Sequence, residues 1–198
     1  EAGYPLSDDF NGAAQEGVGF YQLTQKEGRR WSSARAYLHP IRQRPNLTII
    51  THALASRVLF EGKRAVGVAY RTREGQTVEI QARREVLLSG GAINSPQLLL
   101  LSGIGPRAEL ERHGIPQVHE LPGVGQNLQD HLDVIVAHRE CRRASYGFAL
   151  SFLPRLLKSI VDYRRHGRGF LTSNLAEAGG FVKSDPALPL PNLQYHLT

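Results

Sequence analysis

An apolar run, Val86–Leu88, leads into the sequence Gly91-Ala-Ile-Asn-Ser-Pro-Gln-Leu-Leu-Leu-Leu-Ser-Gly-Ile-Gly105. The apolar run predicts a buried strand that ends in glycines. Ser95 and Pro96 predict the start of a helix, because serine is a favoured N-cap and proline is tolerated at the first helical position. Ser102–Gly103 predicts the end of that helix. The stretch is therefore expected to form a strand, a glycine turn and a helix.

The glycine turn allows two interpretations. Glycine has no Cβ, so another group can approach the backbone closely. The unpaired N–H groups and the dipole of the following helix suit a phosphate or another polar cofactor group. The alternative is a strand–turn–helix unit that only packs. The residues alone favour this alternative, since a glycine pair is weak evidence and no complete G-x-G-x-x-G motif accompanies it.

The flanking sequence predicts the remaining elements. Tight connections at Gly62–Lys63 and Glu74–Gln76 indicate a small antiparallel meander. Its expected strands and the apolar strand after it are Leu47–Thr51, Ala55–Phe60, Ala65–Arg71, Thr77–Ala82 and Glu85–Ser89. Helices are expected over Ala34–Leu38 (ended by Pro40), Pro106–His113 and Phe152–His166, and residues 191–198 alternate like a strand.

Composition excludes several classes of protein. No apolar run approaches the roughly 20 residues that span a bilayer, and one cysteine, Cys141, excludes an internal disulfide framework. The histidines lack the spacing typical of metal ligands, so no metal site is predicted. A net charge of +6 raises a nucleic-acid-binding module as an alternative, but the arginines are scattered and few aromatic residues lie among them.

Residues Gly91–Gly105 closely resemble the second signature of the glucose–methanol–choline (GMC) oxidoreductases. Gly28–Leu38 is similar to another segment of that family. Asn46–Val68 and Leu121–His131 look most like its choline dehydrogenases, and the resemblance continues through Glu177–Phe181. It covers nearly the whole chain.

This resemblance implies an α/β (α+β) fold, the central part of an FAD-binding GMC fold with an antiparallel meander and pieces of the substrate-domain sheet. Residues 46–137 would belong to the FAD-binding domain. Residues 1–45 would form a substrate-domain or cap segment, and residues 138–198 part of the substrate-binding domain.

The resemblance also implies cofactor-binding residues: Val58, Ser89, Gly90, Gly91, Asn127, Asp130 and His131. The backbone at Val58 would contact the adenine side of FAD, the glycine turn would lie beside its dinucleotide part, and the segment from Asn127 to His131 would lie near the flavin cleft. Asp130 and His131 are also open to a loop-ordering role.

Glu177 resembles a carboxylate that some members of the family place near the active-site histidine. There it would hold the orientation of the imidazole or attract a cationic alcohol, which makes it the candidate catalytic residue. The alternative is a surface glutamate beside a Gly–Gly bend.

The implied activity is FAD-dependent oxidation of a primary, choline-like alcohol to the aldehyde by hydride transfer to flavin, with electrons passing to the respiratory chain or oxygen. The family's G-x-G-x-x-G strand does not occur in this sequence, and its catalytic histidine would lie beyond Thr198. We therefore expect an interior fragment that is inactive by itself and exposes apolar surface.

Two alternatives stay open: another aliphatic or aryl alcohol oxidase or dehydrogenase of the family, or a non-catalytic remnant or binding module. We expect no nucleic-acid partner and no transmembrane segment, and a cytoplasmic location or one peripheral to the inner membrane.

Overall fold

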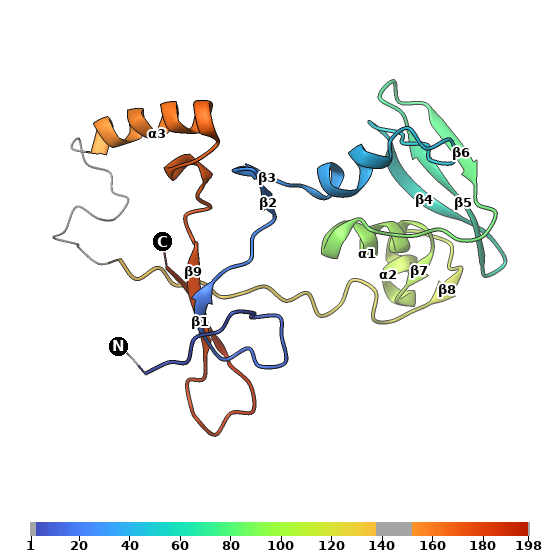
Figure 1. The fold of residues 1–198 in the computed structure, drawn as a ribbon. Helices are drawn as coiled ribbons and strands as arrows, with labels where there is room; N and C mark the ends of the chain where they lie inside the picture. The colour runs from blue at the N-terminus through green and yellow to red at the C-terminus, as the bar shows by residue number, and fades with distance from the viewer. Residues whose placement is uncertain (1–2, 138–151, 198) are drawn as a thin grey trace. The chain divides into compact units, whose positions relative to one another are not determined.

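The computed structural model describes residues 3–137 and 152–197, and Cys141 lies outside these residues. The chain divides into two compact units, one formed by Glu1–Leu47 with His138–Thr198 and the other by Thr48–Ala137 (Figure 1). Each unit combines strands with helices. The expected mixed α/β class is therefore confirmed.

The Thr48–Ala137 unit contains the predicted meander, with strands β4 (Leu54–Glu61), β5 (Arg64–Arg71) and β6 (Thr77–Gln81). They pair antiparallel in the order β4-β5-β6. Gly62, in the turn between β4 and β5, has φ +60°, a conformation that glycine adopts without steric cost. The strand expected at Leu47–Thr51 is wrong, because among the described residues no strand pairs with it.

Helix α1 (Gly91–Leu101) follows the meander, and its start differs from the prediction. Its N-cap is Gly90, five residues before the predicted cap. The Ser95 hydroxyl accepts a hydrogen bond from the Gly90 N–H at 2.9 Å, so this serine closes the first turn from inside the helix. Pro96 therefore lies within the helix and removes one backbone hydrogen bond there.

The segment Glu85–Ser89 does not form a strand, which corrects the second prediction for this stretch. Leu87 is 78% exposed. No strand of the described chain forms hydrogen bonds with the segment, and an apolar sequence becomes a buried strand only where such a partner exists.

Part of the rest of this unit packs around Leu110, which is only 1% exposed. Leu110 belongs to helix α2 (Arg107–Arg112), which confirms the helix expected over Pro106–His113 with Pro106 and His113 as its N-cap and C-cap. Strands β7 (Ile104–Gly105) and β8 (His119–Glu120) pair in parallel beside it.

The other unit is built on an antiparallel sheet in the order β1-β9-β10, formed by β1 (Gly17–Phe20), β9 (Ala178–Val182) and β10 (Leu193–Leu197). β10 confirms the strand expected near the end of the sequence. A short hairpin, β2 (Gln25–Lys26) with β3 (Arg29–Arg30), follows β1.

The helices of this unit largely match the prediction. Ala34–Leu38 is helical (η1, a π-helical turn) and continues through Pro40 as the 3-10 turn η2 (His39–Ile41), so proline does not end it there. Helix α3 (Leu153–His166) ends at Gly167, which has φ +62°, and the short turn η4 (Phe170–Thr172) follows.

The core is small and much apolar surface is exposed, as expected from the sequence. Two of the large exposed side chains are Leu6 (86%) and Ile135 (90%). Among the described residues, every helix is too short or too polar to cross a lipid bilayer. No cluster of three metal-ligating side chains is found within residues 3–137 and 152–197.

Candidate functional site

The N-terminus of α1 is open to an approaching group. Gly91 has φ +85°, and no atom lies within 4 Å of the place where a Cβ would stand. The first N–H groups of a helix have no partner within it, and they carry the positive end of the helix dipole. Ser89, Gly90 and Gly91 are all exposed at this point. The Gly90 N–H already donates to the Ser95 hydroxyl, so a phosphate or another polar group would bind here through the N–H groups that follow it in the helix.

Val58 lies at the opposite end of α1, on the outer edge of β4. Its N–H donates a hydrogen bond of 2.8 Å to the Ser102 hydroxyl, which in turn donates to the Leu98 carbonyl at 2.5 Å. Val58 is 5% and Ser102 is 7% exposed. Because the N–H and C=O of one residue point to the same side of an antiparallel strand, the Val58 carbonyl also faces this edge.

This geometry limits how Val58 could bind a cofactor. Its N–H is already satisfied by Ser102, which leaves the carbonyl as the backbone group for a ligand. The eleven residues of α1 separate Val58 from Gly91 by about 16 Å along the helix. A ligand that contacts both must therefore be extended. Sequence reasoning gave Ser102 only the role of ending the helix.

The segment from Asn127 to His131 is ordered by its own hydrogen bonds. Asn127 has φ +56°, and its side-chain oxygen accepts a bond of 3.0 Å from the Gln129 amide. The Asp130 carboxylate accepts a bond of 2.8 Å from the His131 N–H. The described residues show no polar contact between this segment and Gly90 or Gly91, so the contacts present are those of the loop-ordering interpretation.

Glu177 belongs to the other unit and directly precedes β9. Glu177 is exposed, and its backbone carbonyl accepts a hydrogen bond of 2.9 Å from the Tyr21 N–H. The Tyr21 hydroxyl donates a bond of 2.6 Å to the Tyr195 carbonyl on β10, so the Tyr21 side chain crosses the central strand β9. The His196 ring lies 5.3 Å from the Tyr21 ring.

This crossing requires a glycine. A Cβ on Gly179 would meet the Tyr21 ring and the Tyr195 carbonyl at distances that real side chains do not show. Gly179, Tyr21 and Tyr195 thus fix the backbone that presents Glu177. No local pattern predicts a role for Tyr21, because its partner Tyr195 on β10 is 174 residues away.

Two glutamates outside the candidate site residues have shifted pKa values. Side-chain hydrogen bonds from Arg112 lower the pKa of Glu109 on α2, and hydrogen bonds from its own backbone and from Thr72 lower the pKa of Glu74 in the β5–β6 turn. Both glutamates are on the surface and belong to helix-stabilising or turn-stabilising contacts.

The family described as GMC oxidoreductase matches residues 1–133. The alcohol dehydrogenase [acceptor] of Pseudomonas putida is 56% identical over 99% of this chain, and the oxygen-dependent choline dehydrogenase of Pseudomonas entomophila is 50% identical over 99%. These alignments cover 36% and 35% of the two relatives, so the chain spans about a third of their length.

Solved structures agree with the sequence comparison. The structure of an FAD-dependent oxidoreductase from Chaetomium thermophilum matches 90% of this chain with a TM-score of 0.73 and 29% identity, and the match covers 32% of that protein. The family match extends over most of the chain, and the fold agrees with it. The chain belongs to the GMC oxidoreductase family.

Proposed function

We propose that the whole protein containing this chain oxidises a primary alcohol to an aldehyde with FAD as its cofactor, and that the alcohol resembles choline. The observation that carries the proposal is the glycine-opened N-terminus of α1 in a chain half identical to alcohol and choline dehydrogenases over nearly its whole length. FAD, when bound, supplies the hydride acceptor.

The residues of the Thr48–Ala137 unit fit such a cofactor. FAD is extended and has a pyrophosphate between its two ends, which matches two contact points separated by the length of α1. We assign Ser89, Gly90 and Gly91 to the dinucleotide part and the Val58 carbonyl to the adenine side. Residues 46–137 would then form the cofactor side, with Asn127, Asp130 and His131 near the flavin.

The other unit, with residues 1–45 and 138–198, would form the substrate side. We propose that Glu177 faces the alcohol there, because its carboxylate is exposed beside a rigid three-stranded sheet. A carboxylate attracts the trimethylammonium group of choline, or it orients a neighbouring imidazole that takes the hydroxyl proton. Tyr21 keeps Glu177 in place through the backbone.

The acceptor of the electrons would be oxygen or the respiratory chain, and the protein would be cytoplasmic, or peripheral to the inner membrane if the respiratory chain takes the electrons. Three alternatives differ in what they predict. In the first, another aliphatic or aryl alcohol would take the place of choline. A non-catalytic remnant would bind no flavin, and a nucleic-acid-binding module would bind nucleic acid with an affinity that falls steeply with salt.

An anaerobic titration of the flavin absorption with choline tests the substrate. Bleaching by choline at lower concentration than by benzyl alcohol is the expected result, since only choline carries the cation that Glu177 would attract. Bleaching by benzyl alcohol alone would retain the oxidation chemistry and replace the substrate. A flavin that neither alcohol bleaches would count against the proposal.

A further inference from the structure

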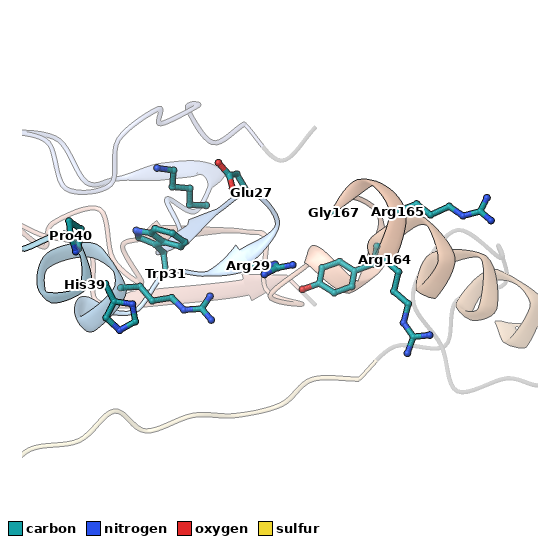
Figure 2. A pocket seen from close by; sticks show the side chains of 11 residues that line it. Glu27, Arg29, Trp31, His39, Pro40, Arg164, Arg165 and Gly167 are labelled. Carbon is teal, nitrogen blue, oxygen red and sulfur yellow. The ribbon is translucent and has the colours of Figure 1, made fainter. Parts of the chain in front are cut away.

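A cavity of about 910 Å³ lies in the unit formed by Glu1–Leu47 and His138–Thr198 (Figure 2). The β2–β3 hairpin, the η1–η2 turns and the C-terminal turn of α3 line it. We call it the Trp31 cleft and define it by six residues: Lys26, Arg29, Trp31, Arg35, Arg164 and Arg165. None of them is among the proposed flavin or substrate residues.

The charge of the Trp31 cleft is one-sided. Five of its defining side chains are cationic, and Glu27 is the single carboxylate that lines it. Over the part of the chain that the structure describes, none of the five cations lies within ion-pair distance of a carboxylate. Arg57, Arg107 and Arg112, by contrast, each pair with a glutamate. Unpaired like charges in a concave surface attract an anion.

Four of these cations have favourable surroundings other than ion pairs. Lys26 Nζ lies 5.3 Å and Arg35 Cζ 6.0 Å from the centre of the half-buried Trp31 ring, within the range of cation–π attraction. Arg164 and Arg165 occupy the last turn of α3, where the negative end of the helix dipole favours cations.

The two walls of the cleft are also fixed to each other. A Cβ on Gly28, at the tip of the hairpin, would collide with the carbonyl of Gly167 at the end of α3. The Gln25 side-chain amide donates a hydrogen bond of 2.8 Å to the Thr172 carbonyl. The hairpin therefore meets the end of α3 closely, so the cations of the two walls lie around the same cleft.

We propose that the Trp31 cleft binds a phosphate group, carried by a soluble metabolite or by a lipid headgroup. Guanidinium groups match phosphate oxygens in bidentate hydrogen bonds, and arginine supplies four of the five cations. The volume exceeds that of phosphate alone, which leaves room for the group that carries it. The proposal does not depend on the flavin chemistry, because its readout is binding.

The test uses pyrophosphate as the soluble probe, with calorimetric titration of the flavin-loaded whole protein at low salt. In Figure 2 Arg165 points away from Trp31, so the cleft variant combines Arg29→Gln with Arg164→Gln, one residue from each wall. The control combines Arg83→Gln with Arg84→Gln, which removes the same charge from exposed positions in the other unit. Both variants should unfold at the same temperature as the parent protein.

The cleft variant should bind pyrophosphate about tenfold or more weakly, while the control changes less than about twofold. A second arm uses phosphatidylcholine vesicles with and without phosphatidylglycerol. Loss of pyrophosphate binding in the cleft variant supports a soluble ligand. Loss of phosphatidylglycerol-dependent vesicle binding, without pyrophosphate binding, supports a headgroup. Binding of neither probe, or equal loss in the control, would overturn the proposal.

Discussion

Replacing Ser102 by alanine removes a side-chain hydrogen bond that joins β4 to the C-terminal end of α1. The Val58 N–H then loses its acceptor at 2.8 Å, and Val58 is only 5% exposed, so water does not replace the hydroxyl. An unsatisfied buried donor costs about 1–3 kcal/mol. The Leu98 carbonyl adds little, because it also accepts the Ser102 N–H at 3.1 Å.

Amide hydrogen exchange of the peptide that contains β4 measures this cost locally. Ser102→Ala should speed exchange at Val58 by about 5- to 150-fold, the equivalent of 1–3 kcal/mol. The matched control is Ser95→Ala, whose hydroxyl accepts from the exposed Gly90 N–H, a group that water can satisfy. Equal exchange at Val58 in both variants would refute the role given to Ser102.

Three further predictions follow from the other contacts. Gly179→Ala should lower the free energy of unfolding by about 1–3 kcal/mol in urea denaturation, because its Cβ meets the ring that crosses β9. The control Gly123→Ala, whose added Cβ meets no atom, should change the free energy of unfolding by less than about 0.5 kcal/mol. Equal losses of stability in the two variants would contradict the position of the Tyr21 side chain across β9. Glu177→Gln should raise KM for choline about tenfold in steady-state kinetics, while kcat/KM for benzyl alcohol stays unchanged. An equal loss of kcat/KM for both alcohols would contradict recognition of the choline cation by Glu177. Arg112→Gln should raise the pKa of Glu109 toward its ordinary 4.5, measured by NMR titration. Because the pKa of Glu109 is lower in the folded protein, its contact with Arg112 stabilises the fold above pH 4.5, and this stabilisation is lost as the pH falls through the folded-state pKa. An unchanged pKa of Glu109 in Arg112→Gln would exclude Arg112 as the cause of the shift.

Local sequence patterns correctly predicted those helices, strands and turns that depend on residues close by in the chain. The tight turn at Gly62 and the end of α3 before Gly167 are each determined by residues inside the element or directly beside it. The start of α1 was predicted from Ser95 and Pro96, but the chain enters the helix earlier because Ser95 bonds back to Gly90. The preference of certain residues for the helix N-cap indicates possible starts of a helix, but it does not show which of them the chain uses.

Local sequence patterns did not predict the contacts between residues that are distant in the chain. The Glu85–Ser89 run has a strand-like composition, yet pairing depends on a partner that composition does not specify. Tyr21 and Ser102 act through residues 174 and 44 positions away. The scattered arginines gave no hint of the Trp31 cleft, because Arg29 and Arg164 come together only when the hairpin meets the end of α3.

The visible absorption spectrum of the purified whole protein tests the central claim most directly, followed by identification of the chromophore released on unfolding. Flavin bands and the release of FAD are expected, with weaker retention of FAD in Ser102→Ala, which disturbs the β4 edge, than in the parent protein. A well-folded whole protein that carries no flavin, and takes up none when FAD is added, would contradict the account.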